Sequence, residues 1–346
     1  MSDLKINNIT NRSGDSGPVI AGVSTVSSSA FMVMPSGDTA NRSAGSGRAV
    51  IGGGNTPSDV NTLDRIEIGT TGNAVDFGDL SAVREQPYGA SSATRGLFAG
   101  GKTDSNIDYV TISSGGGGND FGSLSTSGFG GKGVSDGVTA VYLGGKWGGA
   151  YTGTIQIEYN IIASLGNSSS FGDIASGRVF NQTGGFASPT RGVVGAGAAR
   201  NSPYYQKAIE FLTIATKGST QDFGEISFER SAAGGCASAT RGIFVGGQVP
   251  APTSGVNVID YITIATVGNA TDFGDLTTRR RQMDAGSSLV RGVCIAGYQD
   301  TSPAAIVNTM DYVTIASTGD ATDFGDLTTV NRFTGTCSDS HGGLAQ

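Results

Sequence analysis

The sequence is poor in histidine, tryptophan, cysteine and charge. It has one His, one Trp and three Cys among 346 residues, and 15% of its residues are charged against roughly 25% in an average globular chain. A lone histidine, His341, cannot build a histidine-rich metal site, and any catalytic triad would depend on that one side chain. The three cysteines are an odd number without metal-ligand spacing, so we expect no reliance on disulfides.

Basic surface and long apolar runs are also lacking. The formal net charge is −7, whereas a protein that neutralises nucleic-acid phosphates needs a basic face. No apolar run approaches the roughly 20 residues that span a bilayer, and the first residues lack the apolar core of a signal peptide. We therefore expect neither a nucleic-acid partner nor a membrane partner.

What the sequence does contain is glycine and a repeat. Glycine accounts for 57 residues but follows no collagen period. Segments Ile259–Leu276 and Met310–Leu327 are nearly identical, and their phenylalanine recurs six times at intervals of 44 to 52 residues. Each of the first five phenylalanines is followed by an Arg-Gly or related apolar segment, such as Arg241–Gly247. A period near 50 is in the range of kelch-type propellers.

The repeat has the pattern of β-structure. Residues Ile259–Ile264 alternate apolar and polar side chains, as a half-buried strand does. The pair Gly268–Asn269 suits a tight hairpin, and Asp272–Gly274 would form the returning strand. A polar strand at Met283–Ser288 and the following Arg-Gly strand bring each unit to four strands.

These units predict an all-β, kelch-like β-propeller of four-stranded blades. Apolar residues of the strands and the repeated phenylalanine would fill the space between blades. We expect seven blades, the last one closed by both termini, with N-terminal residues 18–34 supplying strands that the C-terminus lacks. The alternative is six blades with a free N-terminal arm. In either case we expect an attachment arm at 1–17 and a single propeller domain at 18–346.

Two repeated features have both a functional and a structural interpretation. The Asp-Phe-Gly triplet occurs at repeat spacing without other kinase motifs, so its Asp/Asn-rich surroundings would either bind calcium or, as we favour, cap turns. The arginines Arg48, Arg95, Arg191, Arg241 and Arg291 would either form a cationic ring for an anion or a glycan, or pair with repeated acids. We favour the ion pairs, because a side chain present in almost every blade usually serves the fold. No metal and no cofactor is expected.

Binding function is expected where the repeats differ. The connection from the Arg-Gly strand to the next strand varies in length, and all these connections would emerge on one face. They carry rigid, amphipathic aromatic residues that suit contacts with sugars or proteins. The turn Arg279–Arg281 should lie on the same face and be solvated. The predicted binding residues are Trp147, Tyr151, Arg200, Tyr204, Tyr205 and Tyr298.

The wording of the repeat resembles the kelch-like repeats of virion structural proteins from tailed bacteriophages, especially marine cyanophages. The resemblance covers roughly residues 45–346 and rests on segments such as Thr263–Leu276. The tryptophan that recurs in cellular kelch repeats is missing. The resemblance implies a virion component, such as a fibre, tail or capsid-associated protein, and it transfers no catalytic residue.

The first functional hypothesis is a non-enzymatic virion structural protein, present in multiple copies and in contact with other virion proteins. The second is a receptor-binding adhesin that binds a host surface glycan through the variable loops. A third, a polysaccharide-degrading enzyme, would need a unique pair of carboxylates roughly 5–10 Å apart, whereas the acids here recur in every unit.

Overall fold

A computed structural model describes residues 24–25, 32–33, 47–147, 155–176, 180, 182–198, 204–251 and 254–344. The chain divides into two compact units, Met1–Ser43 and Ala44–Gln346. In the first unit, β1 (Ser24–Thr25) pairs with β2 (Met32–Val33) in an antiparallel manner. The predicted arm, residues 1–17, lies outside the described residues, so it stays a prediction.

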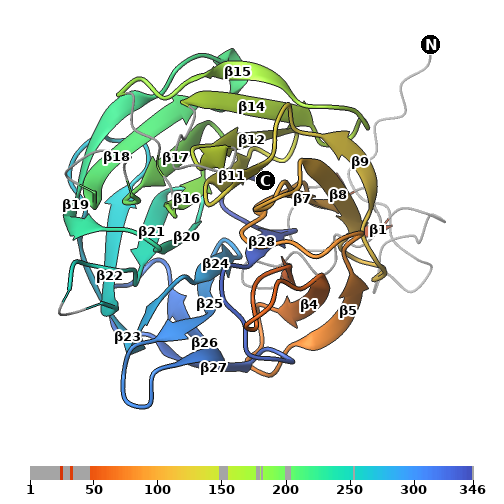
Figure 1. The fold of residues 1–346 in the computed structure, drawn as a ribbon. Helices are drawn as coiled ribbons and strands as arrows, with labels where there is room; N and C mark the ends of the chain where they lie inside the picture. The colour runs from red at the N-terminus through yellow and green to blue at the C-terminus, as the bar shows by residue number, and fades with distance from the viewer. Residues whose placement is uncertain are drawn as a thin grey trace, which may run out of the picture. The chain divides into compact units, whose positions relative to one another are not determined.

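The second unit is an all-β propeller of four-stranded sheets arranged around a central axis (Figure 1). We call each group of four strands a set, number the sets in order around the ring, and list the strands of each set from the axis outward. The first set is β28 (Gly335–Ser338), β3 (Arg48–Gly52), β4 (Thr62–Glu67) and β5 (Val75–Asp79). The second is β6 (Tyr88–Ser91), β7 (Arg95–Ala99), β8 (Asn106–Thr111) and β9 (Asn119–Ser123). The third is β11 (Lys132–Ser135), β12 (Thr139–Leu143), β14 (Gln156–Ile161) and β15 (Ser169–Asp173).

The remaining sets have longer third strands. The fourth is β16 (Gly184–Ala187), β17 (Arg191–Gly195), β18 (Gln206–Thr213) and β19 (Gln221–Arg230). The fifth is β20 (Gly234–Ala237), β21 (Arg241–Val245), β22 (Val256–Thr263) and β23 (Thr271–Arg281), and the sixth is β24 (Asp284–Ser287), β25 (Arg291–Gln299), β26 (Ala305–Thr314) and β27 (Thr322–Asp326). Pairing of β23 with β25 joins the fifth and sixth sets into one eight-stranded sheet. Two short strands, β10 (Gly128–Phe129) and β13 (Lys146–Trp147), pair with each other, and Ile214–Thr216 forms one turn of 3₁₀ helix.

The propeller is confirmed, but seven blades are not. The described strands form six four-stranded sets, two of which are joined into one eight-stranded sheet. Strand β28 pairs with β3 in register, Gly335 opposite Gly52 and Cys337 opposite Val50, so the last strand of the chain completes the first set. In the other sets the innermost strand comes directly before the Arg-Gly strand in the sequence. In the first set the innermost strand, β28, instead comes from the other end of the described chain. The first and last described strands of the propeller therefore belong to one four-stranded set.

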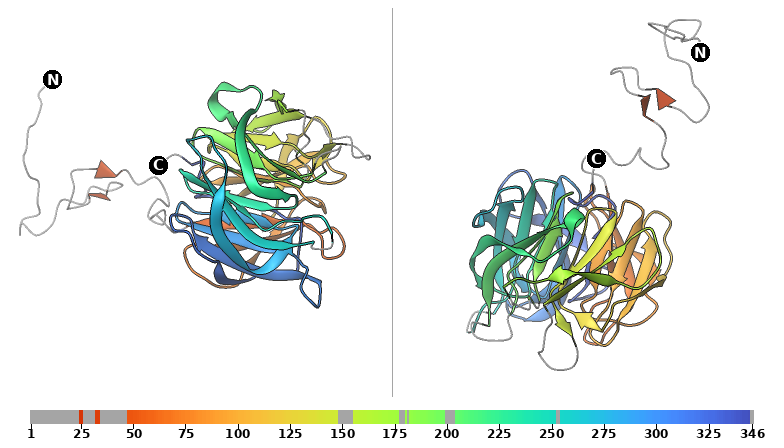
Figure 2. Two further views of the ribbon diagram at one scale, coloured as in Figure 1. Left: turned by 90° about the vertical axis from the view of Figure 1, so that its left-hand side faces the viewer. Right: turned by 90° about the horizontal axis from the view of Figure 1, so that it is seen from above.

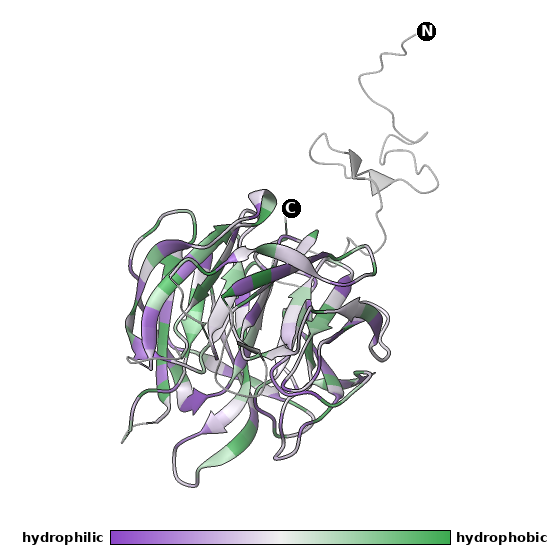
Figure 3. Ribbon diagram, turned by 45° about the horizontal axis from the view of Figure 1, so that its top comes forward, coloured by the Kyte–Doolittle hydropathy of each residue, from purple (hydrophilic) through white to green (hydrophobic). Residues whose placement is uncertain are grey.

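The hydrophobic core lies between neighbouring sets, as predicted. One cluster joins Val50, Leu63 and Phe77 of the first set with Phe98 and other residues of the second. Burial of one Phe contributes roughly 1.5–3 kcal/mol. Seen from the side, the sets stand next to one another around the ring (Figure 2). Hydrophobic and hydrophilic residues alternate along their strands (Figure 3).

The backbone closes the ring a second time near the axis. Two residues before each innermost strand, one residue has a left-handed conformation, with φ between 53° and 77°. Each of these residues donates its N–H to the carbonyl of its counterpart in the preceding set, at N···O distances of 2.5–3.4 Å. The six bonds form a closed cycle, which we call the axial mouth. Its members are Gln86, Gly130, Gln182, Ala232, Gln282 and Phe333.

The repeated acids form a third connection between sets. Asp108 accepts hydrogen bonds of 2.7 Å from the N–H and the hydroxyl of Ser81, which lies at the end of the preceding set. Asp64 accepts in the same way from Thr328, which belongs to the last set. In three sets a fully buried arginine also pairs with the acid. These pairs are Arg84 with Asp108, Arg230 with Asp260 and Arg280 with Asp311.

The structure corrects the expectation for the arginine triplet. Arg280 is fully buried, whereas its neighbour Arg279 is exposed and Arg281 is half-buried. The guanidinium of Arg280 donates to the carbonyl of Thr309 at 2.6 Å as well as to Asp311. Of the three, only Arg279 is exposed to solvent. Side chains alternate along a strand, so Arg280 points into the junction between the fifth and sixth sets.

The two neighbouring arginines give a matched test of the junction. We expect Arg280→Met to lower the free energy of unfolding by about 3–5 kcal/mol, because it leaves Asp311 buried without its counter-charge. Arg279→Met should change it by no more than about 0.5 kcal/mol, since that side chain is exposed. Urea unfolding of both variants measures the difference, and equal values for the two would contradict this role of Arg280.

Candidate functional site

The variable connections lie on one face of the propeller, as the meander requires. The second strand of each set ends there and the third begins there, and the axial mouth lies at the same end, because innermost strands start where second strands finish. We call this end the loop face and the opposite end the closed face. On the loop face β25 extends to Gln299 and pairs with Arg280 and Arg281 of β23. The extended strands therefore make the loop face different from one set to the next.

The structure brings two of the predicted binding residues into contact. The rings of Tyr204 and Tyr205 lie 5.1 Å apart in an edge-to-face arrangement, and Tyr204 is 44% exposed. Trp147 belongs to β13, whose backbone pairs with Gly128 and Phe129. Tyr298 lies in β25, two sets further along the ring than the tyrosine pair. Tyr151 and Arg200 lie outside the described residues. The binding role of all six predicted residues stays a prediction.

Tyr298 lies in a polar cluster that the sequence pattern did not indicate. Its ring centroid is 4.6 Å from Cζ of Arg281 and 5.9 Å from Cζ of Arg332. Arg281 forms an ion pair with Asp300 at 2.9 Å. Arg332 donates to Oδ1 of Asn55 at 3.2 Å and to Oε1 of Gln282 at 3.1 Å. The triplet at 279–281 was a signal for half of this cluster, and Arg332 follows Phe324 by eight residues, as Arg281 follows Phe273.

The repeated arginines connect neighbouring sets, but with partners other than those expected. Each donates from Nη1 to a backbone carbonyl of the next set at 2.7–3.0 Å, and Arg291 does so to Ile68 across the ring closure. Several also stack on an aromatic ring of their own set, as Arg241 does on Tyr261 at 4.4 Å. Among these five, an ion pair is present only at Arg48, with Glu67 at 2.8 Å. Carbonyls replace carboxylates because the side chain reaches the end of a neighbouring strand, where a carbonyl lacks a ladder partner.

The Asp-Phe-Gly segment has a structural role at the rim of the propeller. The carbonyl of Phe273 accepts a hydrogen bond of 2.7 Å from the N–H of Gly319, in the hairpin of the next set. Asp320 of that hairpin accepts from the N–H of Asp275 at 3.0 Å. A Cβ on Gly274 would lie 2.5 Å from the carbonyl group of Gly319, so only glycine allows this approach. The Asp/Asn residues therefore cap backbone groups, and they do so across the junction as well as within the turn.

The six innermost strands enclose an axial cavity of about 60 Å³. Its lining is mainly glycine, alanine, serine and cysteine, and Lys132 borders both this cavity and a smaller pocket of about 40 Å³ at the axial mouth. Lys132 of the third set pairs with Asp284 of the sixth set, across the axis. This ion pair therefore separates the cavity from the loop face.

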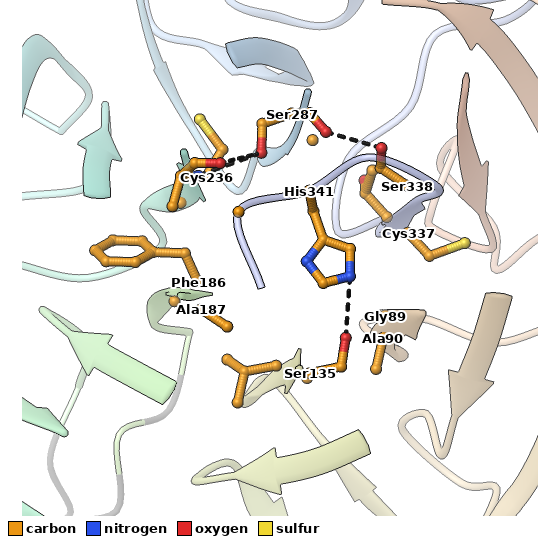
Figure 4. A pocket seen from close by; sticks show the side chains of 18 of the residues that line it. Gly89, Ala90, Ser135, Phe186, Ala187, Cys236, Ser287, Cys337, Ser338 and His341 are labelled. Carbon is orange, nitrogen blue, oxygen red and sulfur yellow. Dashed lines mark hydrogen bonds between the residues drawn. The ribbon is translucent and has the colours of Figure 1, made fainter. Parts of the chain in front are cut away.

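A turn formed by His341–Leu344 covers the other end of the cavity. Nε2 of His341 lies 2.9 Å from the carbonyl oxygen of Ser91, and Gly343 donates its N–H to Nδ1 at 3.1 Å. Nε2 must then bear the proton, so the ring is neutral. The ring is directed at Ser135 in the middle of the pocket (Figure 4). Burial lowers the pKa of His341, while the Ser91 carbonyl and Asp136 act in the opposite direction.

The described residues contain no group of three or more His, Cys, Asp or Glu arranged to hold a metal ion. Within the same residues, no helix has the length and apolarity needed to cross a membrane. The chain matches no protein-family model, and no curated protein matches it. The fold and the blade junctions define a β-propeller whose distinctive polar cluster lies around Tyr298.

Protonation of His341 should weaken the closure of the cavity. Because its pKa is lowered from 6.5 in the folded state, the unfolded chain binds the proton first, and stability is lost as the pH falls from above 6.5 through the folded pKa. A proton on Nδ1 would also face the N–H of Gly343. We expect His341→Gln to lack this part of the pH dependence, measured by urea unfolding between about pH 8 and about pH 4.5. The same pH profile in both proteins would disprove this role of His341.

The cysteines should not react in the folded protein. All three are buried, and burial raises the pKa of Cys236 to about 12 and also raises the pKa of Cys337 and Cys294. Since the thiolate is the reactive form, we expect Ellman's reagent at about pH 8 to label no cysteine before unfolding and all three afterwards. Rapid labelling of the native protein would contradict the closed cavity, because Cys236 and Cys337 line it.

Proposed function

We propose that the chain is a non-enzymatic structural component of a tailed-phage virion that contacts other virion proteins through the loop face of a kelch-like propeller. The observation that carries this proposal is a difference between the residues that recur in the sets and the residues that vary between them. The charged groups that recur in the sets hold the junctions, as Asp108 and Asp311 do with Ser81 and Arg280. The residues that vary between sets lie on the loop face, where contacts with a partner can be specific.

The arrangement of the two faces supports the same proposal. At the closed face, the N–H of Arg48 donates to Asp339 at 2.9 Å, so the first and last described parts of the propeller are adjacent. The loop face lies at the other end of every strand and is free of these segments. The resemblance of the repeats to phage virion proteins is the reason for proposing a virion as the assembly. A protein of this kind would be present in multiple copies and need no cofactor.

A second candidate function is binding of a host surface glycan by the particle. The observation that favours it is the cluster around Tyr298, where an aromatic ring, two guanidinium groups and side-chain amides lie together on the loop face. Aromatic rings and planar hydrogen-bonding groups suit carbohydrate surfaces.

The test is the composition of particles made by the genome that encodes this chain. We expect the chain to co-purify with intact particles at a constant copy number, measured by quantitative mass spectrometry. We also expect purified Tyr204→Ser to bind particles that lack the chain less well than the unchanged protein does. Val267→Ser, at a still more exposed position in a closed-face hairpin, is the control. Absence of the chain from purified particles would refute the proposal.

A further inference from the structure

Arg332 is a positioned guanidinium whose partners are uncharged. It is half-buried, and its hydrogen bonds go to Asn55 and Gln282. Among the described residues, no ion pair involves Arg332, although the other half-buried arginine of the cluster, Arg281, is paired with Asp300. A guanidinium has five donors in a planar fork, which matches a carboxylate. Nε and Nη2 both donate to Oδ1 of Asn55, and Nη1 donates to Oε1 of Gln282, so two of the five donors of Arg332 remain for a carboxylate.

The neighbouring charges are engaged with one another and leave Arg332 without a carboxylate. Near Arg332 lie Lys102, which Glu85 binds at 3.0 Å, and Asp59, which accepts from Asn55 at 2.9 Å. Asp300 is paired with Arg281 in the same way, so each of these carboxylates already has a partner and Arg332 is the cation left over.

Amide side chains and an aromatic ring complete the site. Gln282 borders the 40 Å³ pocket at the axial mouth, together with Gln86 and Gln182. Gln86 is 6% exposed, and its Oε1 has no hydrogen-bond partner. An amide both donates and accepts, as a sugar hydroxyl does, so a row of amides fits a polyhydroxylated ligand better than it fits a simple anion. The half-buried ring of Tyr298 supplies an apolar surface beside the fork.

We propose that this cluster, formed by Asn55, Gln282, Tyr298 and Arg332, is a binding site for a carboxylated saccharide. The carboxylate would contact Arg332, the sugar ring would lie against Tyr298, and hydroxyls would meet the amides. The pocket at the mouth has room for a substituent and not for a whole ring. An acidic segment of a partner protein would bind the guanidinium of Arg332, but it would offer no hydroxyl groups to the amide side chains. The inference rests on the second candidate function and specifies its ligand.

The experiment measures binding of defined sugars to the purified full-length chain by titration calorimetry. The probes are a tetrasaccharide of galacturonic acid and its methyl ester, which keeps every ring and every sugar hydroxyl but lacks the charge. We expect the acid to bind at least about tenfold more tightly than the ester, because a charge-assisted hydrogen bond is lost in the ester. Arg332→Gln should abolish this preference, and Tyr298→Leu should weaken binding of both probes.

The control is Arg279→Gln, which removes an exposed charge from the same region without touching the cluster. It should bind the acid within about twofold of the unchanged protein. Thermal unfolding of each variant confirms that it is folded. Equal affinity for acid and ester, unchanged binding by Arg332→Gln, or preferential binding of a glutamate peptide would each overturn the saccharide assignment. None of these results affects the presence of the chain in particles, so the two proposals fail separately.

Discussion

The structure depends on hydrogen bonds that close a ring of sheets. One four-stranded set cannot bury both of its faces, so each must meet two neighbours. The six members of the axial mouth link each set to the preceding one, and the bond from Phe333 to Gln282 joins the first set to the last. The left-handed conformation of five non-glycine residues is a cost that these bonds and the packing around them offset. Strand β28 and Arg291 complete the closure in the same place along the ring.

The junctions explain why the repeated motifs look functional. Arginine, aspartate and the Asp-Phe-Gly triplet are typical of catalytic and metal sites, and all three recur here for packing. Arg241 binds the carbonyl of Ile315, and Phe273 binds Gly319, each across the boundary between two sets. A buried charge needs a partner, and a repeat provides that partner every fifty residues.

The two ends of the axis differ because different parts of the chain cover them. At the closed face, a Cβ on Gly343 would lie 1.8 Å from the carbonyl oxygen of Ser135, so the terminal turn fits only with glycine there. At the loop face, the Lys132–Asp284 pair blocks the axis, but the surface around it stays polar and irregular. The loop face is also the end where the sets differ from each other.

The sequence alone determined the repeat, the four strands of each unit, the propeller and the face that carries the variable loops, because these follow from local alternation and from a fixed period. It did not determine how many blades close the ring, since β28 pairs with β3 nearly three hundred residues away and no local pattern specifies that pairing. Tertiary structure also decided that Arg280 is buried while Arg279 is exposed, and that Arg332 lies beside Tyr298. Such contacts arise between segments distant in sequence, and their energy depends on burial and charge in three dimensions, which composition and spacing do not encode.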